Sequence, residues 1–207
     1  MNPFQQRIYI NEISLQCYLA ARAAIDYDSS YEISQSSPLP DAPVSALPPG
    51  PERDRILLAQ YDVFRHVHSF LTHAGNVSKL FWPSSAAKRN NESDEAYLLR
   101  IPAVLRGKEL KNLYSLPQIN LLEKRPLRNS LEHFDERLDV YITENQTCHT
   151  DLVIGAEGVL SYSRGHILRH ATADTFYFRG EAYDLSAIAN CLECIYIKSQ
   201  ALLQPTA

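Results

Sequence analysis

The sequence predicts a mainly α-helical protein: a helical bundle with a small β-hairpin insertion before its last helix. Three observations predict this fold class. Apolar residues recur at helical spacing over long segments, most clearly between residues 52 and 80. Gly-interrupted, β-rich patterns are concentrated between about residues 151 and 183. A further apolar stripe at helical spacing follows them. At 207 residues the chain has the length of one domain, and we expect 1–207 to form a single helical domain.

The N-terminal part of the chain predicts two long helices separated by a linker. The first is expected from Pro3 to about Ala24, because Pro suits the first turn of a helix. Its expected core residues are Ile8, Leu15, Leu19 and Ala23, with Ile10, Ile13 and Tyr18 widening the apolar stripe. Residues from about 28 to 51 are rich in Pro and Ser, which is typical of a surface linker. The second helix is expected over about 52–80, with an apolar face of Ile56, Ala59, Val63, Val67, Phe70, Leu71, Ala74 and Val77.

Residues typical of helix ends predict where the helices in the middle of the chain begin and stop. Asn91 or Ser93 is followed by acidic residues, as at the first turn of a helix. Pro102 predicts a kink or a break shortly afterwards. A third long helix is expected to begin at Pro126 and to run to about Tyr141.

The β-rich segment and a last helix complete the predicted fold. The run TFYFRGEAYDL predicts a hairpin that turns around Arg179, Gly180 and Glu181. Asp184 is then placed to cap the last helix. The expected stripe of that helix is Leu185, Ile188, Cys191 or Leu192, Ile195, Ser199 and Leu202.

Composition and charge favour a cytoplasmic protein without a membrane span. The apolar runs are much shorter than the ~20 residues that cross a bilayer. The N-terminal segment lacks the pattern of a signal peptide. Four cysteines are too few for a disulfide scaffold, which favours a reducing compartment. A net charge of −4 counts mildly against a constitutive nucleic-acid binder.

The helix expected from Pro126 carries the run RNSLEH on its polar side. With Leu127 at the origin of a helical wheel, the apolar residues lie within about 60° of one line. These residues are Leu127, Leu131, Phe134, Leu138, Tyr141 and Ile142. On the same wheel Arg128 lies at about 100°, Asn129 at about 200° and His133 at about 240°. All three polar side chains are therefore expected to point away from the core.

Arg128 and His133 lie about 140° apart on this wheel, so they can act together only over a second surface. A two-fold axis with a second copy of the helix would supply that surface and would gather two Arg and two His in one cleft. A histidine that titrates near neutral pH can take or give a proton. A guanidinium can bind a phosphate through two hydrogen bonds. Such a cleft suits cleavage of a phosphodiester without a metal or another cofactor.

A structural interpretation of the same residues stays open. Arg128 can form ion pairs along the helix with Glu132 and Asp135. Arg137 can do the same with the acidic residues of EHFDER. His133 would then be an exposed polar side chain.

The motif from Arg128 to His133 resembles the HEPN superfamily, whose motif is an Arg, four to six residues and a His, often with a polar residue directly after the Arg. The resemblance implies a helical bundle that forms a homodimer. It also implies a metal-independent RNA endonuclease, as in toxin–antitoxin and phage-defence systems, with RNA as substrate and a cognate antitoxin or partner protein. Arg128 and His133 would be the catalytic pair, with Asn129 supporting them. The superfamily also contains non-catalytic binding and scaffolding members.

Two other functions remain as alternatives. A non-catalytic helical interaction or scaffolding protein would use the same polar face to bind a partner. A metal-dependent hydrolase would use His66, His68 or His73. No two of these three histidines are four residues apart, so they are poorly placed for a metal pair.

Two smaller groups complete the candidate residues. His166 and His170 are expected to face solvent, where they could join Arg164 and Arg169 in an RNA-binding surface. Cys191-x-x-Cys194 lacks the second ligand pair of a zinc site, and both cysteines are expected to be small core residues one turn apart.

Overall fold

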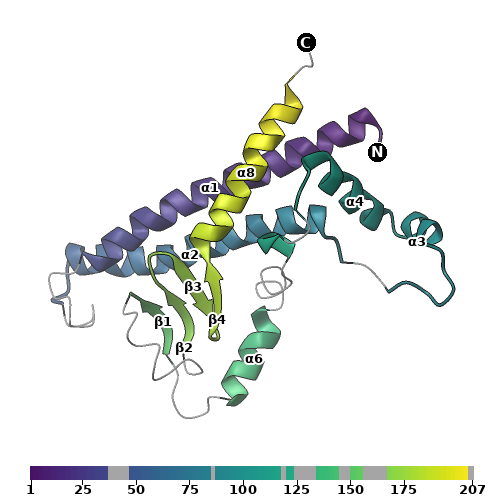
Figure 1. Ribbon diagram of the computed structural model, residues 1–207. Coiled ribbons are helices and arrows are strands. Elements are labelled where there is room, and N and C mark those ends of the chain that lie inside the picture. The colour runs from purple at the N-terminus through teal and green to yellow at the C-terminus, as the bar shows by residue number, and fades with distance from the viewer. Residues whose placement is uncertain are drawn as a thin grey trace.

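A computed structural model describes residues 1–36, 47–84, 87–117, 120–123, 134–144, 150–155 and 167–204. The protein is mainly helical, with a small four-stranded sheet before the last helix (Figure 1). The predicted fold class is therefore confirmed. Residues 37–46 of the expected Pro/Ser linker lie outside the described residues, and residues 28–35, which were also expected in the linker, belong to the first helix.

The first two helices, α1 (Pro3–Gln35) and α2 (Pro51–Phe81), form a long antiparallel hairpin (Figure 1). Asn2 caps α1 by accepting a hydrogen bond from the backbone N–H of Gln5. The helix continues to Gln35, which corrects the predicted end near Ala24. It continues because small and aromatic residues keep one side of it in the core as far as Ser34.

The buried face of α1 differs from the predicted one. The side chains in the core are Ile10, Ile13, Cys17, Ala20, Ala23 and Tyr27. Of the expected stripe, Ile10, Ile13 and Ala23 are buried and Leu19 is half-buried, whereas Ile8, Leu15 and Tyr18 are exposed. The prediction for α2 is confirmed, because all eight residues of its expected apolar face are buried.

Two shorter helices follow α2. Helix α3 (Asp94–Arg100) is capped by Ser93, as predicted, and the break comes at Pro102, where α4 (Pro102–Tyr114) begins. Helix α4 packs on the end of α2 through Gly107. A Cβ atom at Gly107 would lie 2.6 Å from the carbonyl oxygen of Phe81, so only glycine fits this contact.

The sheet consists of β1 (Thr150–Ile154), β2 (Ile167–Ala171), β3 (Thr175–Phe178) and β4 (Glu181–Asp184), in that order. Strands β1 and β2 pair in parallel, and the other pairs are antiparallel. The predicted hairpin is confirmed: Arg179 and Gly180 both have positive φ (53° and 78°), as a two-residue type I′ turn requires. The insertion is nevertheless larger than a hairpin, since β1 and β2 extend it.

One face of the sheet packs on α2. Phe176 and Phe178 are fully buried, and the ring of Phe64 on α2 meets that of Phe176 edge to face at 6.4 Å between centroids. On α1, the Tyr27 hydroxyl donates a hydrogen bond to the backbone carbonyl of Thr172. The sheet is therefore held against both long helices.

Helix α8 (Leu185–Leu203) closes the core. Asp184 caps it by accepting from the backbone N–H of Ala187, as predicted. Its buried stripe is Leu185, Ile188, Leu192, Ile195 and Ser199. Of the two residues predicted for the middle of the stripe, Cys191 or Leu192, it is Leu192 that is buried. The helix crosses α1 (Figure 1), and Gln200 donates a hydrogen bond to the Ser14 hydroxyl there.

The helix expected from Pro126 to Tyr141 is described only from α6 (Phe134–Glu144) onwards. Leu138 and Tyr141 contact the core, as the wheel requires, but Ile142 is exposed and was wrongly placed on the core face. Figure 1 shows α6 and the short 3₁₀ helix η2 (Leu121–Glu123) on the opposite side of α2 from α1.

Candidate functional site

The three predicted catalytic residues, Arg128, Asn129 and His133, lie outside the described residues. Their mutual geometry, and the expected two-fold cleft, therefore stay predictions. The described part of the same expected helix begins directly after His133, at the first residue of α6.

The histidines of α2 have three separate environments. His66 lies 3.1 Å from the Arg65 guanidinium, and His73 lies 2.7 Å from the side-chain oxygen of Gln16 on α1. The ring of His68 meets that of Phe176 edge to face. Burial lowers the pKa of His68, and the positive charge of Arg169 lowers it further. Within the described ranges, no three His, Cys, Asp or Glu side chains are grouped as metal ligands.

His170 is fully buried in β2, so its prediction as a solvent-facing residue is wrong. Its Nε2 lies 2.6 Å from the carbonyl oxygen of Gly155, and its ring stacks on that of Tyr177 at 5.3 Å between centroids. In β2, His170 pairs with Tyr177, so its side chain lies on the face of the sheet opposite Phe176 and Phe178 and is buried there. Arg169 is half-buried beside it, while Arg164 and His166 lie outside the described residues.

The two cysteines of the C-x-x-C have different surroundings. Cys191 is half-buried against the core, and burial raises the pKa of its thiol. Cys194 is exposed, so the prediction that it is a core residue is wrong, whereas Cys191 packs against the core. Both thiols are free.

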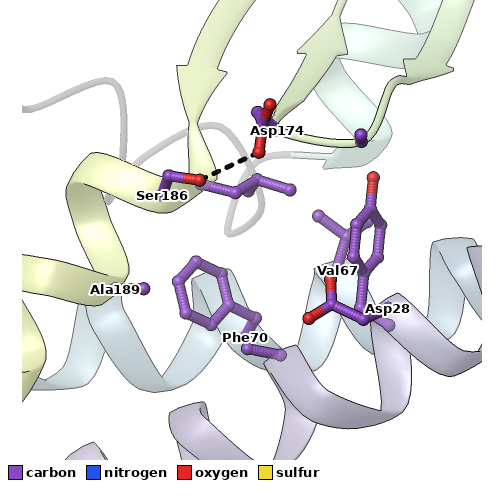
Figure 2. A pocket seen from close by; sticks show the side chains of 10 residues that line it. Asp28, Val67, Phe70, Asp174, Ser186 and Ala189 are labelled. Carbon is purple, nitrogen blue, oxygen red and sulfur yellow. Dashed lines mark hydrogen bonds between the residues drawn. The ribbon is translucent and has the colours of Figure 1, made fainter.

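A pocket of about 170 Å³ lies where α1, α2, the β2–β3 turn and the start of α8 meet. Figure 2 shows its polar rim: Asp174 accepts a hydrogen bond from the Ser186 hydroxyl at 3.1 Å, and Asp28 of α1 lies nearby. Burial raises the pKa of Asp28, and the negative charges of Glu32 and Asp174 add to the effect. The rim therefore favours a positively charged group.

A second pocket of about 350 Å³ continues the first between α1 and α8. The two share Ala24, Phe70 and Ala189 as lining residues. The second is mainly apolar, and Glu193 is the acidic residue of its lining. Sequence patterns could not reveal either pocket, because the lining residues come from elements far apart in the chain.

The outward side of α1 carries a row of exposed large apolar side chains. They are Phe4, Ile8, Leu15, Tyr18 and Ile25, with exposed fractions from 49% to 72%. Asn11 and Arg22 occupy the two intervening positions, so the seven residues alternate in spacing between four and three. We call these seven residues the outer stripe. It is the largest departure from the predicted core, and two of its members, Tyr18 and Ile25, also line the second pocket beside α8.

Among the described residues, no helix has the length and apolar character needed to cross a membrane. Searches against protein-family models, curated proteins and solved structures returned no match.

Proposed function

We propose that the chain is a metal-independent RNA endonuclease of the HEPN type that acts as a homodimer, in the role of a toxin or phage-defence effector with a cognate partner protein. The observation that carries the proposal is the R-N-S-L-E-H motif directly before α6. The inward contacts of Leu138 and Tyr141 on α6 support the wheel from which the outward direction of the motif was derived. The mainly helical fold also supports it.

In the proposed reaction, His133 of one copy takes the proton of the ribose 2′-OH as a general base. The 2′ oxygen then forms a bond to phosphorus, and the bond from phosphorus to the 5′ oxygen breaks. His133 of the second copy gives a proton to that leaving oxygen. Arg128 binds the phosphate and offsets its developing charge, with Asn129 supporting the pair. The products end in a 2′,3′-cyclic phosphate and a 5′-hydroxyl.

The test is RNA cleavage by the purified full chain, with and without EDTA. Wild type should cleave RNA equally in both conditions, and Arg128→Ala and His133→Ala should each lower the rate at least about a hundredfold. His66→Ala is the matched control, since His66 lies at the surface of α2 and takes no part in the proposed reaction. Equal cleavage by wild type and His133→Ala, or no cleavage by wild type in either condition, would refute the ribonuclease function.

A second candidate function, a non-catalytic helical interaction protein, is favoured by a specific observation: the outer stripe of α1. Soluble proteins seldom expose a contiguous row of large apolar side chains unless another surface covers it. Under this function, charge introduced at Leu15 should abolish the biological activity of the protein, whereas His133→Ala should leave it intact. The reverse pattern would exclude it in favour of the ribonuclease.

A further inference from the structure

Helix α1 has apolar residues on two opposite sides, which is the pattern of a helix that is covered on both. Its inner side is covered by the rest of the chain. There the residues at positions 10, 13, 17, 20, 24, 27, 31 and 34 are buried or half-buried. The outer stripe repeats the same alternation of three and four residues on the opposite side. A helix that packs on the protein through one side only would carry polar residues on its other side. The apolar residues of the outer stripe therefore require a separate explanation.

The spacing of the outer stripe is that of a coiled-coil seam. In a heptad repeat, two positions recur at alternating intervals of three and four residues, and they face a partner helix. The stripe keeps this spacing from Phe4 to Ile25, which is about three heptads and about 32 Å of helix. The spacing of the surface therefore suits a second helix along its length.

We propose that the outer stripe binds the α1 helix of a second copy of the chain, antiparallel to the first. The argument is self-complementarity of register. If Ile8 is level with Ile25 of the second copy, then each stripe residue from position 8 to position 25 is level with a stripe residue of the second copy. The layers then pair Ile8 with Ile25, Leu15 with Tyr18 and Asn11 with Arg22. Apolar residues meet apolar ones, and the two polar residues meet each other.

The charges flanking the stripe agree with this orientation. In the same register, Arg7 lies within two residues of the level of Asp28 of the second copy, on the same side of the interface. The charged groups that act on Asp28 within its own chain are acidic, namely Glu32 and Asp174. An arginine from a second copy would supply the positive charge that the rim of the pocket favours.

The parallel arrangement is disfavoured by the same residues. It would set Arg22 against Arg22 of the second copy, so two like charges would meet within the seam. The antiparallel pairing avoids this repulsion. It builds on the interaction function and is independent of the ribonuclease, because it uses no residue of the motif.

The first test is the mass of the full chain in solution by sedimentation equilibrium across a dilution series. We expect a reversible dimer of twice the 23.5 kDa chain mass, or a tetramer if the motif interface of the proposed ribonuclease also forms. The double variant Leu15→Glu, Tyr18→Glu should have half the mass of the wild type, as a monomer or as a dimer paired through the motif, because it places charge in the central layers. Both side chains are about half exposed in one chain, so helical circular dichroism should be unchanged. Leu58→Glu on α2 is the control, since Leu58 is 64% exposed but lies outside the stripe.

The second test determines orientation by cysteine cross-linking, in a background where Cys148 and Cys194 are serine. In the antiparallel register, Ile8→Cys alone cannot form a disulfide across the dimer, because the two copies of position 8 are about 26 Å apart along the helix axis. Mixing Ile8→Cys with Ile25→Cys should give the cross-linked heterodimer on oxidation. In a parallel pair the single variant would cross-link instead.

Several outcomes would overturn the proposal. A monomer at every concentration would refute self-pairing, and a mass that the double glutamate variant leaves unchanged would refute the use of the outer stripe. Equal disruption by Leu58→Glu would do the same. Cross-linking by Ile8→Cys alone would refute the antiparallel register. If the chain is monomeric but Leu15→Glu still abolishes its biological activity, self-pairing fails while the interaction function stands.

Discussion

The hydrogen bond from Tyr27 to the carbonyl of Thr172 joins α1 to the sheet, and Tyr27→Phe tests how much it contributes. The donor and acceptor are 2.5 Å apart, and both residues are buried. Removing the hydroxyl leaves a buried carbonyl without this donor, a loss that costs about 1–3 kcal/mol. The ring of Tyr27 stays, along with its stacking on Tyr31 at 6.0 Å. We therefore expect a loss near the lower half of that range.

The assay is urea unfolding of the purified chain, followed by circular dichroism. In thermal unfolding, a second readout, a loss of about 1.5 kcal/mol corresponds to a fall of about 3–6 °C in Tm for a chain of this length. Tyr61→Phe is the matched control, because Tyr61 is 62% exposed, and its change should stay within about 0.5 kcal/mol. If Tyr27→Phe also changes the free energy of unfolding by less than about 0.5 kcal/mol, this bond does not fasten the sheet to α1.

Three further predictions concern α4, α8 and the pH dependence of stability. Gly107→Ala should lower the free energy of unfolding by about 1–2 kcal/mol, because the new Cβ would meet the backbone of Phe81, and this clash exceeds the gain in helix propensity. Asp184→Ala should cost about 1 kcal/mol by removing the cap of α8, measured by urea unfolding. Burial lowers the pKa of His68 in the folded chain, so the unfolded chain binds more protons. Stability should therefore fall as the pH is lowered below 6.5, towards the folded-state pKa, and His68→Gln should flatten that fall in unfolding curves measured at a series of pH values.

Matched variants separate these causes from general damage. Lys108→Ala, at an exposed position next to Gly107, should leave stability nearly unchanged, and an equal loss would contradict the clash. Asp184→Asn should keep most of the cap, because Asn and Asp cap helices about equally well. A loss as large as that of Asp184→Ala would contradict the capping argument. For His68, an unchanged acid limb in the Gln variant would show that other groups govern the pH dependence.

The success of the sequence predictions depended on how many sides of an element carry apolar residues. Helix α2 has one apolar face, so periodicity identified all of its expected core residues. Helix α1 has two, and periodicity cannot tell which one the chain covers. The covered side uses small residues such as Cys17 and Ala20, while the larger Leu15 and Tyr18 lie outside. Large apolar side chains were therefore mistaken for the core.

Local turn chemistry located β3 and β4, but not β2. The Arg179-Gly180 turn is visible in the sequence because glycine favours positive φ. Strand β2 contains Arg169 and His170, whose polar side chains obscure a strand pattern. Its partner β1 is parallel and is connected through a segment outside the described residues, so no short-range signal could predict the pairing. The acidic rim of the pocket, with Asp28 and Asp174, depends on the same long-range packing.

The position of α2 between α1 on one side and η2 and α6 on the other has a consequence for stoichiometry (Figure 1). The motif lies between η2 and α6 in the sequence, and the ribonuclease proposal needs a two-fold axis at the motif. The outer stripe of α1 would need another two-fold axis, on the far side of α2. A subunit with two different self-complementary surfaces builds a closed tetramer or a growing chain of subunits. If both interfaces form, the smallest closed assembly therefore contains four chains. Each interface has its own dissociation constant, so a dilution series would show two separate association steps when the two constants differ.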